Sequence, residues 1–395
     1  MTQKSLENVL NRFRSVQDYN PMINPTAAGN GGGLTVTQSA TAPAGLTDIG
    51  NLAGMIATNT LPLALNGVPQ TPYGTVVRSQ IPKSGGGGGF AMSTFGLTFD
   101  GTTICVKVEN SGSGFRVICD DYYIGSDTPT VFSLANGTYI TVNFAVGGLH
   151  TVVIERQTNG AIEAILKPTT TQLWKPREAP LKALALTDSY GNTTLNFEHD
   201  SLYRIASHFM GWSLVAQIQG GTGHVNPSAT AGFSRFGSED RMRYVTAQPY
   251  DVVLLGGGLN DSLGSMAGSV YANVLEHLRA IRDAQPEALI IVLGAFGAAT
   301  GPSTGANSIT EVELSIRSAV MAMCDSAILF IPISTTIDEN RPWLFGTGRV
   351  GATNNTGNSD IYIGPGDNTH PNQAGHLYLG QRLADAVVSA VQKAL

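Results

Sequence analysis

Five nearly uninterrupted apolar segments in the second half of the chain constrain its fold most strongly. They are LKALALT at 181–187, SLVAQIQ at 213–219, DVVLLGG at 251–257, ALIIVLG at 288–294 and AILFIPI at 327–333. Strands that are apolar on both faces are typical of a parallel sheet covered by helices on both sides. Helical patterns at 271–284 and 311–324, and a final helix opened by Pro371, supply such cover. We therefore expect a five-stranded α/β domain over residues 181–395.

The residues from about 90 to 178 follow a different pattern, with short strands separated by turns. The expected strands are 102–109, 114–121, 138–146, 150–157 and 161–168. Turn sequences such as Asn110-Ser111-Gly112 lie between them. Several short strands with regular turns indicate a β-sandwich, of jelly-roll type, which we assign to residues 36–178. The segment from Pro176 to Pro180 is then the linker between the two domains.

Residues 1–35 are expected to hold a short amphipathic helix at 5–17 and a flexible segment. Such a helix has nothing local to pack against, so it could contact the second domain, another subunit of a homo-oligomer or a larger particle. Irregular structure and short strands are expected from 22 to 90, a segment that includes the run Gly85 to Gly89. We expect neither a secretory signal nor a membrane span, because no apolar run has the required length.

Charge and cysteine content exclude other classes of protein. A net charge of −6 lacks the positive field of a nucleic-acid binder, so we expect no nucleic-acid partner. The three cysteines form no Cys-x-x-Cys or Cys/His cluster, so we expect no metal site. Cys105 and Cys119 lie symmetrically about an expected hairpin loop. They could form a cross-strand disulfide or be two small buried thiols.

Four polar segments follow the expected strands or precede the last helix. The first strand ends in Thr187-Asp188-Ser189, where a serine could be a nucleophile or only a helix cap. The second leads into GGTGH at 220–224 and the third into GGGLND at 256–261. Their backbone amides and the Asn260 side chain are donors of the kind that an oxyanion hole requires. DNTH at 367–370 places a carboxylate three residues before an imidazole, the arrangement of an oriented general base.

Together these four segments resemble the blocks of the SGNH, or GDSL-type, hydrolase superfamily over residues 181–395. The resemblance implies a flavodoxin-like three-layer fold and ester hydrolysis through an acyl-enzyme, without metal or other cofactor. It implies the following roles: Ser189 as nucleophile, His370 as base, Asp367 as its orienting acid, and Ser189, Gly223 and Asn260 as oxyanion donors. Thr187 stands where the superfamily usually has glycine, and Gly221 could take the role given to Gly223.

Other residues near these segments have two interpretations each. We assign His224 and Asp188 to substrate binding, although a loop histidine is more often a bystander. His376 is a poorer base candidate than His370. Four aromatic residues could form a sugar-stacking wall or seal loops against the core; they are Phe296, Trp343, Phe345 and Tyr362. The glycine-rich segment 346–366 is expected to be a mobile loop that leads to the base.

A β-sandwich before an SGNH-like domain also resembles the plan of carbohydrate esterases that remove acetyl groups from polysaccharides. We therefore expect a serine esterase that acts on an acylated carbohydrate. One alternative is a phage tail or surface protein whose hydrolase-like domain only binds glycans. A lipase or a thioesterase is another alternative within the enzymes.

Overall fold

The computed structural model describes most of the second half of the chain and the strands of the first. The described residues are 23–24, 33–49, 57–58, 77–78, 94–108, 114–120, 122–125, 130–132, 138–156, 161–174, 181–191, 200–230, 232–297, 307–366 and 368–394. The expected helix at 5–17, the run Gly85 to Gly89 and the linker from Pro176 to Pro180 lie outside them. The chain divides into two compact units, with Ala91–Glu178 in one and Ala179–Leu395 in the other.

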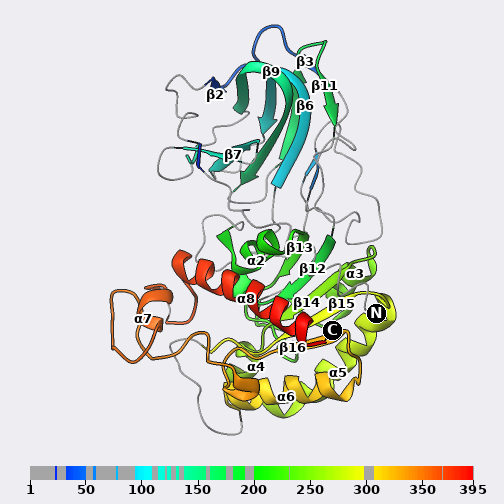
Figure 1. Ribbon diagram of the computed structural model, residues 1–395, viewed down its shortest axis with the longest axis vertical. Coiled ribbons are helices and arrows are strands. Elements are labelled where there is room, and N and C mark those ends of the chain that lie inside the picture. Colours follow the sequence, from blue (N-terminus) through cyan, green and yellow to red (C-terminus); the bar gives the residue numbers. More distant parts are fainter. Residues whose placement is uncertain are drawn as a thin grey trace. The chain divides into compact units, whose positions relative to one another are not determined.

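The C-terminal unit contains the five-stranded parallel sheet that the apolar segments predict (Figure 1). Its strands are β12 (Leu181–Thr187), β13 (Trp212–Ile218), β14 (Val252–Gly256), β15 (Leu289–Leu293) and β16 (Ile328–Ile331). Every pairing is parallel, in the order β13-β12-β14-β15-β16. All residues of β14 and β15 are buried, as expected for strands covered on both faces.

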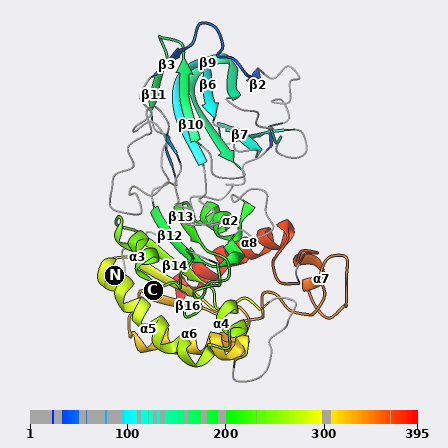
Figure 2. The ribbon, with the colours of Figure 1, turned by 180° about the vertical axis from the view of Figure 1, so that it is seen from behind.

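Helices cover both faces of this sheet. They are α2 (Leu202–Met210), α3 (Glu239–Thr246), α4 (Leu259–Leu263), α5 (Ala267–Ala284), α6 (Ile309–Ala322), α7 (Ser359–Tyr362) and α8 (Gln373–Ala394). Helix α2 packs against α8, which crosses in front of the sheet in Figure 1, while α5 packs against α3 and α6. Figure 2 shows α8 from the opposite side, with the strands in front of it.

The strand order places a topological switch point between β12 and β14. From β12 the chain moves to β13 on one side, and after β14 it continues to β15 and β16 on the other. This is the flavodoxin-like order, in which ligands bind beyond the carboxyl ends of the strands at the switch point. Two of the polar segments singled out in the sequence, after Thr187 and after Gly256, leave the sheet at this position.

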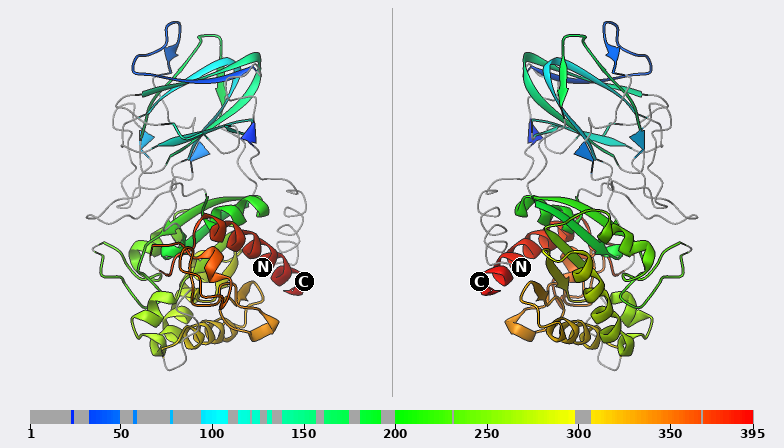
Figure 3. Two further views of the ribbon diagram at one scale, coloured as in Figure 1. Left: turned by 90° about the vertical axis from the view of Figure 1, so that its left-hand side faces the viewer. Right: turned by 90° about the vertical axis from the view of Figure 1, so that its right-hand side faces the viewer.

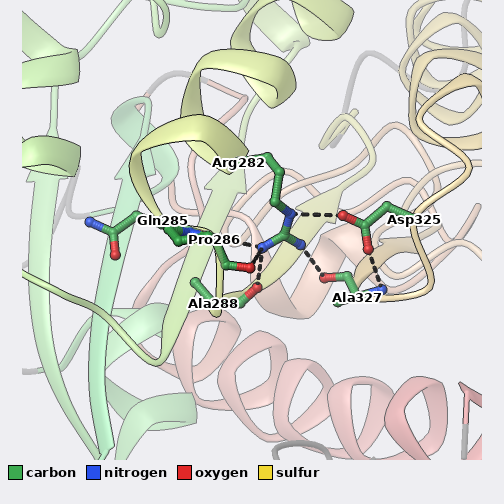
Figure 4. A network of polar contacts seen from close by, with 6 residues as sticks. All are labelled: Arg282, Gln285, Pro286, Ala288, Asp325 and Ala327. Atoms are coloured by element: carbon green, nitrogen blue, oxygen red, sulfur yellow. Dashed lines mark hydrogen bonds and ion pairs between the residues drawn. The ribbon is translucent and has the colours of Figure 1, made fainter. Parts of the chain in front are cut away.

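Arg282, near the end of α5, ties this helix to the start of two strands (Figure 4). Its guanidinium donates to the carbonyls of Gln285, Pro286 and Ala288 at 3.0, 3.2 and 2.8 Å. It also donates to Asp325 Oδ2 at 2.7 Å, and Asp325 Oδ1 accepts from the Ala327 N–H at 2.8 Å. One half-buried cation thereby binds three carbonyls in the segment that follows the helix.

The described strands of the N-terminal unit join in a single hydrogen-bonded sheet. They are β1 (Ile23–Asn24), β2 (Leu34–Ser39), β3 (Thr47–Asp48), β4 (Ala57–Thr58), β5 (Val77–Arg78), β6 (Thr94–Val108), β7 (Phe115–Cys119), β8 (Tyr122–Ile124), β9 (Thr138–Arg156), β10 (Ala161–Lys167) and β11 (Gln172–Trp174). Strands β6 and β9 pair along most of their length and appear as long curved ribbons in Figure 3. Side chains from β2, β6, β7, β9 and β10 share one apolar core. The expected β-sandwich of jelly-roll type is therefore not confirmed, because β6 and β9 are continuous members of one sheet.

Two local expectations for this unit are wrong. The expected strands 138–146 and 150–157 are one strand, since the chain continues extended through Gly147 and Gly148 and takes up the change of register as an irregularity. The expected hairpin between Cys105 and Cys119 does not form, because β6 pairs with β9 and β10, and β7 with β9 and β8. Both cysteines are free and buried, and they belong to different apolar clusters, which excludes the cross-strand disulfide.

Candidate active site

Ser189 lies immediately beyond the carboxyl end of β12, in a short 3-10 turn from Ser189 to Gly191. The Asp188 carboxylate accepts the Tyr190 N–H at 2.9 Å, and the Asp188 carbonyl accepts the Gly191 N–H at 3.1 Å. A side chain at position 191 would place Cβ 2.7 Å from Thr187 Oγ1, so the turn needs glycine there. These contacts fix the backbone on both sides of the serine.

His370 is brought to Ser189 from the other end of the domain. Its Nε2 lies 2.7 Å from Ser189 Oγ, a hydrogen-bond distance, although the two residues are 181 positions apart. The loop that carries it is held by the Gly364 N–H, which donates to the His370 carbonyl at 2.9 Å, and by a bridge between Ile363 and Pro371. Asp367, the expected orienting acid, lies outside the described residues.

Asn260 follows β14 at the same edge of the sheet. Its side-chain amide donates to the Thr222 carbonyl at 2.8 Å, which uses one of its two N–H groups and fixes the orientation of the other. Gly258, two residues earlier, has φ +129° and would bring a Cβ within 2.9 Å of Ala295. The turn that presents Asn260 therefore depends on glycine.

Of the glycines after β13, the one beside the nucleophile is Gly220. A Cβ at this position would lie 3.6 Å from the Cβ of Ser189, and no hydrogen bond is found for its N–H among the described residues. Gly223 has another arrangement: its N–H donates to the Asn226 carbonyl at 2.8 Å, and a Cβ there would meet the Asp261 carboxylate at 2.5 Å. The N–H of Gly223 is thus already engaged in a turn, which argues against the oxyanion role expected for it.

The same loop rests on Asp261, a residue that the sequence did not single out. Its carboxylate accepts the N–H groups of His224, Val225 and Asn226, each at 2.9 Å. Burial raises the pKa of Asp261, and these three donors oppose the rise. The aspartate after Asn260 therefore fixes the loop that follows β13 to the turn that follows β14.

Two residues expected at the substrate are buried instead. His224 is fully buried, its ring lies edge-on to Phe236 with centroids 5.0 Å apart, and burial lowers its pKa to about 3. Asp188 is 1% exposed and points inward to the N–H of Tyr190. Burial raises the pKa of Asp188 to about 7. Both side chains support the site from within, so the structure does not place them where they could bind a substrate.

Arg241, from α3, lies fully buried beneath the nucleophile turn. Its guanidinium donates to the carbonyls of Thr187 and Gln217 at 2.9 and 2.7 Å and to Thr222 Oγ1 at 3.0 Å. Burial lowers its pKa to about 9, while the charge of Asp188 acts in the opposite direction. One cation thus joins the carboxyl ends of β12 and β13 to the glycine-rich loop. In the sequence this arginine looks like an ordinary member of a charged surface helix, and no local signal reveals its burial.

The aromatic residues near the site divide into two groups. Phe296 and Trp343 are 1% and 2% exposed, so they seal loops against the core and do not form a sugar-stacking wall. Phe345 is 45% exposed, and Tyr362 stacks on Tyr378 with ring centroids 4.3 Å apart. His376 is also buried, with Nδ1 accepting the Leu202 N–H at 3.2 Å. It therefore supports the start of α2.

Within the described ranges, no three side chains of His, Cys, Asp or Glu come together as metal ligands. None of the helices described above combines the length and the apolar character needed to cross a membrane.

Neither protein-family models nor curated protein sequences match this chain, but solved structures do. A family two carbohydrate esterase from Clostridium thermocellum, in complex with cellohexaose, is 19% identical over 78% of this chain and 94% of its own, with a TM-score of 0.55. An acetyl xylan esterase from Butyrivibrio proteoclasticus is 12% identical over 88% and 99%, with a TM-score of 0.57. A salicylyl-acyltransferase from a tetracycline biosynthetic pathway is 14% identical over 75% and 82%, with a TM-score of 0.58. With its strand order and the position of Ser189, this chain therefore has the SGNH hydrolase fold.

Proposed function

We propose that this protein is a serine esterase that removes short acyl groups, acetyl above all, from a carbohydrate. The observation that carries the proposal is the 2.7 Å contact between Ser189 Oγ and His370 Nε2 at the carboxyl edge of a parallel sheet. A serine hydroxyl is a weak nucleophile unless a base at this distance takes its proton. We assign catalysis to residues 181–395 and an accessory role to residues 36–178.

In the proposed reaction, Ser189 Oγ attacks the ester carbonyl carbon while His370 accepts the hydroxyl proton. The tetrahedral intermediate collapses when His370 gives this proton to the oxygen of the leaving sugar, which leaves an acyl group on Ser189. A water molecule, deprotonated by His370, then attacks the acyl carbon and releases the carboxylic acid and the free serine. We retain Asp367 in the role of orienting His370 during both steps.

For the oxyanion we propose three donors: the N–H of Ser189, the N–H of Gly220 and the second amide hydrogen of Asn260. Gly220 takes the place first given to Gly223, since it lies beside Ser189 and its N–H is not used by the described part of the fold. The Asn260 amide is already oriented by the Thr222 carbonyl, so it needs no reorganisation as charge develops.

The choice of substrate class is supported by the named structural neighbours, two of which are carbohydrate esterases. The acyltransferase among them suits the same first half-reaction, because transfer to a hydroxyl and transfer to water differ only in what accepts the acyl group. At these identities the likeness extends to the fold alone, so the substrate class requires a direct test.

The test measures acid release from p-nitrophenyl acetate, butyrate and octanoate, and acetate release from acetylated xylan and other acetylated glycans. We expect acetate esters to be the fastest, and Ser189→Ala to abolish the rate. Ser318→Ala on α6, whose hydroxyl donates to the Leu314 carbonyl, is the matched control and should leave it unchanged. A Ser189→Ala protein as active as the wild type would refute the proposal. A preference for octanoate would indicate a lipase instead.

A further inference from the structure

Tyr190 connects the two reactive residues although it is neither of them. It follows Ser189 directly in the turn, and its hydroxyl donates to the carbonyl of Thr369 at 2.7 Å. Thr369 is the residue before His370. A single side chain therefore bridges the residue after the nucleophile and the residue before the base.

The position of this hydroxyl is fixed by packing. Tyr190 is fully buried, and its ring stacks on Phe296 with centroids 4.6 Å apart and an angle of 11° between the planes. Phe296 in turn lies edge-on to the buried Trp343. At its other end the Tyr190 backbone N–H is held by the Asp188 carboxylate at 2.9 Å. A ring held on these sides cannot move its hydroxyl without disturbing the core.

The loop that carries the base needs such support. On the side after His370, it is attached to the domain by the bridge between Ile363 and Pro371 and then by α8. On the side before it, Asn368 has a φ of +61°, the left-handed conformation that asparagine adopts more readily than most other residues with a side chain. The bond from Tyr190 reaches the chain between these two positions, at Thr369.

We infer that Tyr190 is a positioning residue for the base: its hydroxyl holds the backbone at Thr369 so that His370 Nε2 stays within hydrogen-bond distance of Ser189 Oγ. The inference rests on the proposed function, because it assigns a role within the same reaction. Since the anchor and the nucleophile are adjacent in one rigid turn, any movement of Ser189 carries the attachment point of the base with it. A displacement of the base by about 1 Å is enough to cost on the order of 100-fold in rate.

The first experiment compares Tyr190→Phe with the wild type, using a fluorophosphonate that labels the active serine. Phenylalanine keeps the stacked ring and removes only the hydroxyl, so the fold should persist, and circular dichroism and thermal unfolding check this. We expect labelling and kcat for p-nitrophenyl acetate to fall about 10-fold, with KM nearly unchanged. Tyr203→Phe is the matched control, because Tyr203 is buried and no partner for its hydroxyl is found in the described structure. It should label at the wild-type rate.

The second experiment is a double-mutant cycle with His370→Ala. If Tyr190 acts through the base, removing its hydroxyl has no further effect once the base is absent, so His370→Ala and the double variant should label at rates within about two-fold. A general distortion of the nucleophile turn would slow labelling by the same factor in both backgrounds. Slowing by the same factor in both backgrounds would overturn the inference, and so would a Tyr190→Phe variant that labels at the wild-type rate. Either result would leave the esterase proposal intact. If wild type and Ser189→Ala label alike, the proposed function fails, and the inference fails with it.

Discussion

Replacing the buried Arg241 by methionine gives a test of what holds the nucleophile turn in place. Methionine approximates the length of the arginine stem but donates no hydrogen bonds. The substitution leaves the carbonyls of Thr187 and Gln217 and the hydroxyl of Thr222 without their donor, in a place with no access to solvent. It also removes the positive charge that acts on Asp188.

The size of the effect follows from these contacts. A hydrogen bond from a charged group contributes about 1.5–3 kcal/mol, and three of them are lost. Part of this contribution is offset by the cost of removing the charged guanidinium from water, which also lowers the pKa of Arg241 to about 9. Removing one partner of a buried charge network typically costs about 3–5 kcal/mol, and we expect a loss of that order in the free energy of unfolding.

The variant should also change how stability depends on pH. The pKa of Asp188 is raised from 3.8 to about 7, so the folded protein holds a proton that the unfolded chain releases, and stability falls as pH rises through this window. In the wild type this fall ends near pH 7. Without Arg241 the pKa of Asp188 rises further, so stability should continue to fall above about pH 7, by up to about 1.4 kcal/mol per pH unit.

Urea unfolding at several pH values between about 6 and 8 measures both effects. Arg243→Met, on the same helix, is the matched control, because the Arg243 side chain is 46% exposed and its ion pair with Glu239 lies at the surface. That change should cost less than about 1 kcal/mol. The reasoning is refuted if Arg241→Met costs no more than the control, or if its stability is level between pH 7 and 8.

Three further outcomes follow from the geometry. Asn260→Ala should lower kcat on p-nitrophenyl acetate by about 10²–10³ with little change in KM, and an unchanged kcat would exclude Asn260 from the oxyanion hole. Arg282→Ala should lower the free energy of unfolding by about 2–4 kcal/mol in urea while kcat stays constant; a stable variant would contradict the structural role given to this network. Burial lowers the pKa of His224 from 6.5 to about 3. As the pH falls below 6.5, the histidine therefore binds a proton in the unfolded chain but not in the folded protein, and the free energy of unfolding of the wild type decreases. His224→Leu should therefore lose about 2 kcal/mol less of its free energy of unfolding than the wild type does when the pH falls to about 5. If urea unfolding shows the same loss for both proteins, this prediction is wrong.

The C-terminal unit could be predicted from the sequence because its information is local and repeated. Each apolar segment is long enough to identify a buried strand, and parallel strands bring their carboxyl ends to one edge without further information. Ser189 and Asn260, which follow two of these strands, could therefore be assigned to one edge of the sheet, whereas the role of His370 came from its DNTH segment and the resemblance to SGNH hydrolases. The choice between Gly220 and Gly223 could not be made in this way, because it depends on which N–H a turn leaves unused.

Other features depend on contacts that no local pattern encodes. The pair Gly147-Gly148 looks like a turn, and only its pairing with β6 shows that one strand continues through it, with an irregularity in the register. Arg241 lies between Asp240 and Met242 on a helix rich in charge, and its burial is decided by the sheet beneath. The bond from Tyr190 to Thr369 joins residues 179 positions apart, so it too exists only after the fold is complete.

The separation of the nucleophile and the base along the chain has a consequence for how this protein is made. A ribosome that has translated Ser189 must add 181 more residues before His370 exists, and the loop that carries it is then held in place by the last helix. A nascent or truncated chain that stops short of this point contains the serine but no partner to activate it. Under the proposed function, hydrolysis can begin only after the loop that carries His370 has docked beside Ser189.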